Sequence, residues 1–212
     1  MSDYILLQGV TPSELLEKVQ PYGQPFGYQE ERDGLIVHDL TPAVGQEATQ
    51  SSLGRAEFLP HTDAAFLPVE ERPARLALLG INNDAKSATL IYRLTDVLSH
   101  LDAETVEKLQ QPLFEQIPPL TFQGKLGSDP RKGHRIVTRD ENGEFVVAYS
   151  AQGTRGGEAP EVLAAFEEAL KATTPIRFVI GPEDLLIFDN LHCLHGREVI
   201  VGPRHLQRVY LR

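Results

Sequence analysis

Apolar residues recur at helical spacing in a few stretches of the chain. The clearest stripe joins Val162, Phe166 and Leu170, with glutamates and a lysine on the opposite side, which is typical of a helix that packs one face on a core. Near the start, Thr11-Pro12-Ser13-Glu14 forms a capping-box pattern. The predicted helices are 11–20, a weaker one starting at Thr41-Pro42, 102–116 with a break or kink at Pro112, and 160–173.

Short apolar runs between turn signals fill most of the remaining sequence. The predicted strands are Tyr4–Leu7, Leu35–His38, Ala74–Leu79, Ala88–Tyr92, Arg135–Thr138, Phe145–Tyr149, Ile176–Ile180, Leu185–Phe188 and His205–Leu211. Many short strands with helices outside them predict a mainly β fold with a sandwich, jelly-roll or barrel core. Because there is no repeat, low-complexity segment or linker, residues 1–212 are expected to form one domain.

Composition narrows the classes of protein. The 212 residues include 20 lysines and arginines against 30 aspartates and glutamates, a formal net charge of −10. This argues against a protein that binds nucleic acid or an anionic membrane, because both need a basic surface. The single cysteine excludes an internal disulfide and a zinc site with two or more cysteines. Without a signal-peptide pattern or an apolar run near the roughly 20 residues of a membrane span, we expect a soluble cytoplasmic protein.

The pair His61 and Asp63 is the first candidate for metal binding. In an extended segment, residues two apart point to the same side, so an imidazole and a carboxylate would lie next to each other. Such a pair is two thirds of the triad of two histidines and one carboxylate that holds non-haem Fe(II) and leaves other positions open. A His-x-Asp pair alone is more often an exposed surface pair, so this interpretation needs a third ligand from elsewhere.

A second group of histidines follows the apolar strand predicted at 185–188. We interpret the segment after that strand as a loop in which His192 or His195 supplies the third ligand. One alternative is that either histidine simply forms hydrogen bonds within the loop. Another is a zinc site of His192, Cys193 and His195, which is disfavoured because the spacing is cramped and no second cysteine completes a known pattern.

The last predicted strand carries two arginines on one face. Arg204 and Arg208 are four residues apart, which corresponds to about 13 Å along a strand. If that face points inward, each guanidinium needs an anionic partner, because an unpaired buried charge is very costly. Two separated arginines near a metal then suggest two carboxylates to bind. Taken alone, two arginines on a solvent-exposed face are the simpler interpretation.

Four sequence blocks, taken together and in order, resemble the Fe(II)/2-oxoglutarate-dependent oxygenases. The most similar branch is the clavaminate synthase-like one, with its arginine and asparagine hydroxylases, and taurine dioxygenase is a more distant relation. The blocks are His61-Thr62-Asp63-Ala64-Ala65-Phe66, Ala88-Thr89-Leu90, Asp189-Asn190 followed by His195-Gly196-Arg197, and Arg204-His205-Leu206-Gln207-Arg208-Val209-Tyr210. The resemblance covers residues 50–212, of which 98–175 match only loosely, and it implies a double-stranded β-helix, a jelly-roll variant.

The resemblance also implies roles for individual residues. The implied iron ligands are His61, Asp63 and His195. His195 is favoured over His192 because it occupies the histidine of the His-Gly-Arg block. Arg204 and Thr89 match the residues that bind the distal carboxylate of 2-oxoglutarate. The implied cofactor is therefore Fe(II), with 2-oxoglutarate and O2 as cosubstrates.

The substrate side is implied more broadly. Arg208 matches an arginine that contacts the acid group of the substrate, and Ser51, Tyr149 and Ser150 are further candidates for substrate contact. The expected activity is hydroxylation of an unactivated C–H bond in a small carboxylate-bearing molecule, a free amino acid or a derivative. Family members are typically longer than this chain. Either the substrate is small, or a partner or a second subunit covers the site.

Three alternatives stay open at this point. The same chemistry would serve a sulfonate, a betaine or a carrier-tethered acid. A cupin-like jelly roll would bind a metal or a small acid without catalysis. A zinc hydrolase built on His61, Asp63 and His195 is the least favoured alternative, because it has no need of two inward arginines.

Overall fold

The computed structural model describes residues 3–45, 48 and 51–212. The helices are α1 (Leu15–Val19), α2 (Leu94–Leu98), α3 (Ala103–Leu109), α4 (Leu120–Leu126) and α5 (Pro160–Ala172), with 3-10 turns η1 (Gln20–Tyr22), η2 (Arg32–Gly34) and η3 (Val69–Glu71). The strands are β1 (Tyr4–Leu7), β2 (Pro25–Phe26), β3 (Val37–Leu40), β4 (Phe58–His61), β5 (Arg75–Asn82), β6 (Thr89–Arg93), β7 (Phe114–Gln116), β8 (Arg131–His134), β9 (Val137–Arg139), β10 (Phe145–Val147), β11 (Thr154–Arg155), β12 (Ile176–Phe178), β13 (Leu185–Asp189), β14 (Cys193–Arg197) and β15 (His205–Leu211).

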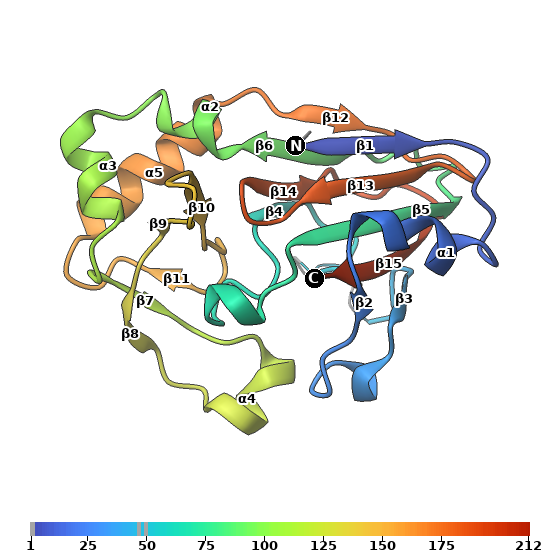
Figure 1. The fold of residues 1–212 in the computed structure, drawn as a ribbon, viewed down its shortest axis with the longest axis horizontal. Coiled ribbons are helices and arrows are strands. Elements are labelled where there is room, and N and C mark those ends of the chain that lie inside the picture. The colour runs from blue at the N-terminus through green and yellow to red at the C-terminus, as the bar shows by residue number, and fades with distance from the viewer. Residues whose placement is uncertain (1–2, 46–47, 49–50) are drawn as a thin grey trace.

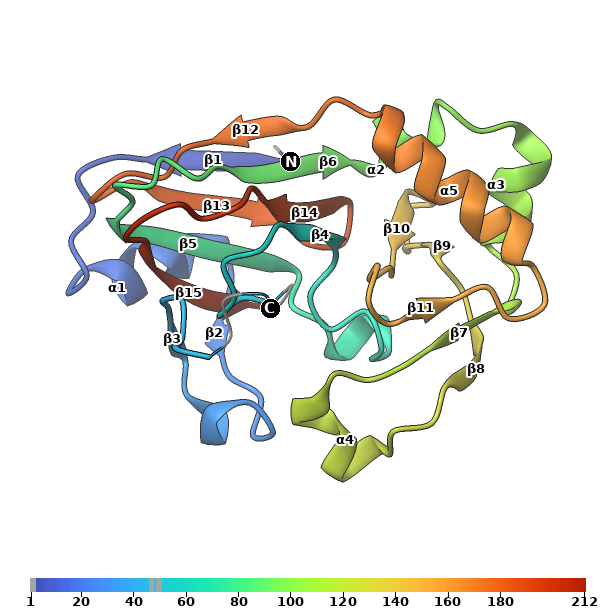
Figure 2. The same cartoon turned by 180° about the vertical axis from the view of Figure 1, so that it is seen from behind.

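Two antiparallel sheets form the centre of the molecule (Figures 1 and 2). The larger has the order β1-β13-β5-β15-β2, with β3 also paired to β15, and the smaller has the order β12-β6-β14-β4. A cluster of buried side chains from both sheets, including Leu76, Phe188, Ile91 and Cys193, fills the space between them. The sheets therefore pack face to face, as in a jelly roll.

Alternation along the strands of the larger sheet decides which side chains reach this space. Ala77 and Val209 point to the outer face and pack in a cluster with Leu15 of α1. Leu206 points the other way, into the cluster between the sheets. Arg208 lies two residues further along β15, so it has the same direction, and it is only 7% exposed. The face of β15 that carries Arg208 therefore points inward, and its guanidinium needs an anionic partner.

The same alternation in the smaller sheet directs a histidine inward. Leu194 of β14 packs with Phe166 of α5 in a cluster that also contains residues of α2 and α3. These helices gather at the end of the molecule opposite α1 (Figures 1 and 2). Cys193, one residue before Leu194, lies between the sheets. His195 therefore points to the same interior as Arg208, from the facing sheet.

The predicted helix at 160–173 is confirmed by α5, and the other helix predictions need correction. Helix α1 begins at Leu15 rather than 11, and residues 12–14 form a turn, although the Thr11 amide donates to the Glu14 carboxylate as in a capping box. The helix predicted at 102–116 ends at Leu109, and 114–116 forms β7, which pairs with β8 and β11. No helix begins at Thr41 within the residues described up to 45, and 46–47 and 49–50 lie outside the description.

Most predicted strands are present with their ends shifted by a few residues. The main error concerns the segment after β13, which was interpreted as a loop and is strand β14. The histidine, glycine and arginine of β14 conceal the usual strand composition. The glycine is required here, because a Cβ at Gly196 would lie 2.8 Å from the carbonyl oxygen of Phe58 in β4. Across the part of the chain that the structure describes, no helix has both the length and the apolar character to cross a bilayer.

Candidate metal centre

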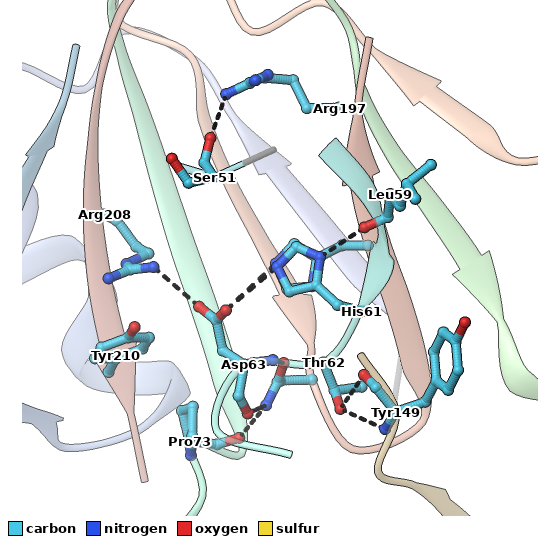
Figure 3. Close-up of polar contacts among 12 residues, drawn as sticks. Ser51, Leu59, His61, Thr62, Asp63, Pro73, Tyr149, Arg197, Arg208 and Tyr210 are labelled. Carbon is cyan, nitrogen blue, oxygen red and sulfur yellow. Dashed lines mark hydrogen bonds and ion pairs between the residues drawn. The ribbon is translucent and has the colours of Figure 1, made fainter. Parts of the chain in front are cut away.

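Two neighbouring strands bring the three predicted metal ligands together. His61 ends β4 and lies directly opposite His195 of β14 in the register of the smaller sheet, and Asp63 follows two residues after His61. One ligand atom from each residue lies within 4.8 Å of the others. The His61 Nε2 is 3.4 Å from Asp63 Oδ1, and the His195 Nε2 is 3.9 Å from the same oxygen. Figure 3 shows the carboxylate of Asp63 facing the ring of His61.

Hydrogen bonding fixes the form of one imidazole. The Nδ1 of His61 lies 2.9 Å from the carbonyl oxygen of Leu59, so it carries the proton and leaves Nε2 with a free lone pair (Figure 3). The Nδ1 of His195 is buried with no hydrogen-bond partner among the described residues. Burial, helped by the neighbouring His61, lowers the pKa of His195 to about 3. The lowered pKa keeps the His195 imidazole neutral at neutral pH, so this ring is available as a ligand.

The two oxygens of the Asp63 carboxylate face different groups. Its Oδ1 faces the imidazoles, while its Oδ2 accepts a hydrogen bond of 3.1 Å from Arg208 Nη1. Burial opposes ionisation of Asp63, but the Arg208 guanidinium and the two imidazoles outweigh it and hold its pKa well below the usual range. One oxygen is thus left for a cation while the other is held by the arginine.

These donors fit a divalent metal. Adjacent ligands of an ion with bonds of about 2.1 Å lie about 3 Å apart in octahedral geometry. The corresponding separations here are 3.4 and 3.9 Å, and all three ligand atoms lie within 4.8 Å of one another. Two neutral imidazoles and one ionised carboxylate on one side of a site are the ligand set typical of non-haem Fe(II). Among the residues that the structure describes, this is the one cluster of histidine, cysteine and acidic side chains close enough to hold an ion.

Arg204 and Thr89 meet elsewhere in the same pocket. Both residues line one pocket between the sheets, together with the three candidate ligands. Arg204 Nη2 lies 3.4 Å from the Thr89 hydroxyl, while Arg204 Nε is buried without a partner among the described residues. Burial lowers the pKa of Arg204 to about 9, with a contribution from Arg197. A buried and unmatched guanidinium of this kind calls for an anion.

Arg208 has a different environment, because protein carboxylates already surround it. Besides Asp63, its Nη2 donates to Glu31 at 2.6 Å and lies 2.9 Å from Nδ1 of His38. The hydroxyl of Tyr210 donates to the same Glu31 carboxylate at 3.0 Å. The Nε of Arg208 has no hydrogen-bond partner among the described residues. Arg208 therefore offers a hydrogen-bond donor to the pocket, but its charge is matched before any ligand binds.

The three other candidates for substrate contact, Ser51, Tyr149 and Ser150, are not among the residues that line the pocket. Figure 3 shows the ring of Tyr149 pointing away from Asp63, and its hydroxyl donates to Glu167 at 3.1 Å. Ser150 pairs with His61 in an isolated β-bridge and donates its amide to Thr154. The carbonyl of Ser51 accepts from Arg197, and it is Ser52 that lines the pocket.

The alternative ligand His192 is occupied elsewhere. Its Nδ1 lies 3.0 Å from an Asp189 carboxylate oxygen, and its Nε2 lies 3.9 Å from Asp140. The Asp189 hydrogen bond raises the pKa of His192. The zinc arrangement of His192, Cys193 and His195 is therefore not formed.

Helix α4 and the loop between β2 and β3 contact each other at one side of the site. Phe122 of α4 packs edge-on against Tyr28, with 5.4 Å between the ring centroids, and contacts Phe66, three residues after Asp63. Lys125, also on α4, pairs with Glu30 at 2.7 Å. In Figures 1 and 2, α4 and the loop between β2 and β3 project on the same side of the sheets.

Sequence reasoning missed three residues of this centre. Asn190 is fully buried and accepts a hydrogen bond from the main-chain amide of Asp63. The sequence motif included Asn190 without predicting a role for it. A polar residue directly after an apolar strand was the available signal. His38 and Glu31 contact Arg208 from a distant part of the chain, and no local pattern marked either of them.

The chain is similar to characterised amino-acid oxygenases. It is 28% identical over 206 residues to enduracididine beta-hydroxylase of Streptomyces hygroscopicus, covering 83% of this chain and 58% of the relative. It is 27% identical to L-asparagine oxygenase of Streptomyces coelicolor, covering 89% and 58%. The chain thus spans less than two thirds of the length of these curated relatives.

Solved structures share the fold. An asparagine oxygenase in complex with Fe(II), a hydroxyasparagine and succinate matches with a TM-score of 0.86 and 24% identity, over 99% of this chain and 74% of that one. This likeness confirms the predicted jelly-roll class. The sequence model described as "Taurine catabolism dioxygenase TauD, TfdA family" matches residues 6–210. With two facing sheets, a His-Asp-His cluster between them and a match along nearly its whole length, the chain belongs to the TauD/TfdA dioxygenase family.

Proposed function

We propose that this protein is an Fe(II)- and 2-oxoglutarate-dependent dioxygenase that hydroxylates an unactivated C–H bond of a free amino acid or a close derivative. The observation that carries the proposal is one pocket holding both the His61, Asp63 and His195 cluster and the unmatched guanidinium of Arg204. A metal site alone would serve many reactions. A metal site that shares its pocket with a buried arginine awaiting an anion suits a metal-chelating acid with a second carboxylate.

The residues of this chain divide the work of binding. His61, Asp63 and His195 would hold the iron, with Arg208 keeping one oxygen of Asp63 away from it. Arg204 and Thr89 would bind the distal carboxylate of 2-oxoglutarate. Iron, 2-oxoglutarate and O2 supply the oxidising power, and the balanced reaction is R–H + 2-oxoglutarate + O2 → R–OH + succinate + CO2.

The protein's contribution beyond binding is placement of the substrate. Misplacing the reacting C–H by about 1 Å costs on the order of a hundredfold in rate. Arg208 lines the pocket and retains a free Nε, so it is the proposed donor to the acid group of the substrate. The backbone around Ser51 and Ser150 would form part of the surrounding wall. No described contact of the Tyr149 ring supports a direct role for that side chain.

The amino-acid assignment rests on the relatives. Those that match are named as hydroxylases or oxygenases of enduracididine, lysine, asparagine and ornithine or arginine. Matched solved structures hold a hydroxyasparagine or a hydroxyarginine with succinate. A sulfonate, a betaine or a carrier-tethered acid would use the same iron chemistry and is the alternative.

The test is a substrate panel. The purified chain, Fe(II), ascorbate, 2-oxoglutarate and air are incubated with each of the twenty amino acids, their derivatives, taurine and a betaine. Mass spectrometry then measures succinate and any product that has gained one oxygen. We expect one amino acid or a small group of them to stimulate succinate formation and to gain 16 mass units. Stimulation by a sulfonate alone would replace the amino-acid assignment. Absence of Fe(II)-dependent succinate with every compound would contradict the proposed reaction.

A further inference from the structure

A second buried arginine lies at the Arg204 part of the pocket. Arg197 of β14 is 5% exposed, as is Arg204, and both line the pocket. Arg208 is paired with two carboxylates, whereas neither Arg197 nor Arg204 forms an ion pair among the described residues. Within residues 3–45, 48 and 51–212, this part of the pocket therefore contains two buried positive charges that no carboxylate matches.

Thr89 connects the two arginines. In the smaller sheet, Arg197 lies directly opposite Thr89 of β6, and the Thr89 hydroxyl is the oxygen nearest Arg204 Nη2. Figure 3 shows the guanidinium of Arg197 reaching from β14 toward Ser51. An anion bound at Arg204 and Thr89 would thus be within the electrostatic range of Arg197 as well.

The hydrogen bonds of Arg197 do not remove its charge. Its three nitrogens donate to the main-chain carbonyls of Glu198, Ser51 and Ala56. A guanidinium has five N–H groups, so two of them are left over. Peptide carbonyls satisfy hydrogen bonds without supplying a full negative charge. The arginine therefore serves two purposes: it holds the 51–56 segment against β14, and it keeps a positive charge buried beside the pocket.

We propose that Arg197 is a second cation of the cosubstrate site, which strengthens binding of the distal carboxylate at Arg204 and Thr89. The inference rests on the proposed function and deepens it, since it adds Arg197 to the residues that recognise the far carboxylate of a 2-oxo diacid. It predicts that removing the charge weakens diacid binding on the order of tenfold, as for one ion–ion interaction screened by protein. An acid that lacks the distal carboxylate should bind equally well with or without Arg197.

Variants separate the charge from the segment that it holds. Arg197→Gln and Arg197→Met both remove the charge. Two such variants are made so that the test still works if one of them does not fold. Arg197→Lys keeps the charge and cannot reproduce a planar fork to three carbonyls. Arg55→Gln is the matched control, because Arg55 holds the same segment by donating to the Gly202 carbonyl at 2.8 Å and does not line the pocket.

The first measurement needs no metal, so it is independent of the iron chemistry. Calorimetric titration of the metal-free protein with glutarate should show binding that Arg197→Gln or Arg197→Met weakens about tenfold, while Arg197→Lys stays within about threefold and Arg55→Gln is unchanged. Equal glutarate affinity in wild type and Arg197→Gln would overturn the proposal. So would a loss in Arg197→Lys as large as in Arg197→Gln, or no binding of glutarate to the wild type.

The second measurement uses Mn(II)-loaded protein without oxygen. We expect Arg197→Gln to weaken 2-oxoglutarate and to leave 2-oxopentanoate, which lacks the distal carboxylate, unchanged. Equal weakening of both acids would show a structural role and overturn the proposal. If no metal binds at all, the proposed function fails while the glutarate result still decides the role of Arg197.

Discussion

Asn190 and Asp63 hold each other through reciprocal hydrogen bonds. The side-chain oxygen of Asn190 accepts from the Asp63 amide at 2.9 Å, and its nitrogen donates to the Asp63 carbonyl at 3.1 Å and to the Pro73 carbonyl at 2.9 Å. The residue that follows β13 thereby fixes the backbone of the loop that follows β4. The loop that carries the candidate metal ligand Asp63 is thus tied to the end of β13.

Replacing Asn190 should therefore destabilise the loop that follows β4 and carries Asp63. Asn190→Ala leaves buried main-chain groups of Asp63 and Pro73 unsatisfied, at a cost of about 2–4 kcal/mol in the free energy of unfolding. Asn190→Asp keeps the acceptor but loses the donor. Urea denaturation of the metal-free protein measures both, with Asn142→Ala in an exposed turn as the control. Unfolding midpoints equal to that of the control would show that the clamp contributes nothing.

Arg204 should control the affinity for the cosubstrate. Arg204→Met removes the buried charge that lacks a partner, so 2-oxoglutarate binding should weaken by about 2–5 kcal/mol. Thr89→Val removes only a neutral hydroxyl and should cost about 0.5–1.5 kcal/mol. Calorimetry with Mn(II)-loaded protein measures both losses. The assignment of Arg204 is wrong if its variant binds 2-oxoglutarate as tightly as the wild type.

The ion pairs of Arg208 predict a coupling between two substitutions. Arg208→Met leaves Asp63 and Glu31 as buried carboxylates without their shared cation, which should destabilise the metal-free protein by about 3–5 kcal/mol. Adding Glu31→Gln removes one of the two charges and should restore part of the loss. Denaturation of the single and double variants gives the coupling. Strictly additive effects would contradict the shared-cation account.

His134 should contribute a pH dependence of stability. Burial, helped by nearby Arg72, lowers its pKa from 6.5 to about 4 against the hydrogen bond to the Ala148 carbonyl. As pH falls from 6.5 to about 4, the unfolded chain takes up a proton that the folded protein does not, so stability falls by at most about 1.4 kcal/mol per pH unit. His134→Gln should flatten this slope relative to wild type and to the exposed control His100→Gln. An identical slope in all three proteins would show that His134 does not titrate in this way.

The sequence predicted those parts of the site that depend on local geometry. The spacing of two between His61 and Asp63, and of four between Arg204 and Arg208, places side chains on a common face in any extended segment. The pairing of β4 with β14 depends on residues more than a hundred positions apart. The sequence offered His192 or His195 as the third ligand, and only the resemblance to a known family favoured His195.

The remaining features depend on tertiary contacts that no local pattern encodes. Glu31 reaches Arg208 from a loop near the start of the chain, which changes the expected unmatched charge of Arg208 into a matched one. Strand β14 was missed because histidine and arginine occupy two of its inward positions in place of apolar residues, and a glycine lies between them. The ring of Tyr149 points away from Asp63 (Figure 3) because it packs edge-on against Phe166 of α5, with 5.1 Å between the ring centroids.

Metal stoichiometry tests the central claim most directly. Oxygen-free protein is dialysed to equilibrium against Fe(II), and bound iron per chain is measured by mass spectrometry for the wild type, His195→Ala and His192→Ala. We predict one ion per chain for the wild type and for His192→Ala, and loss of binding for His195→Ala. Retention of iron by His195→Ala together with its loss from His192→Ala would contradict the metal centre described here.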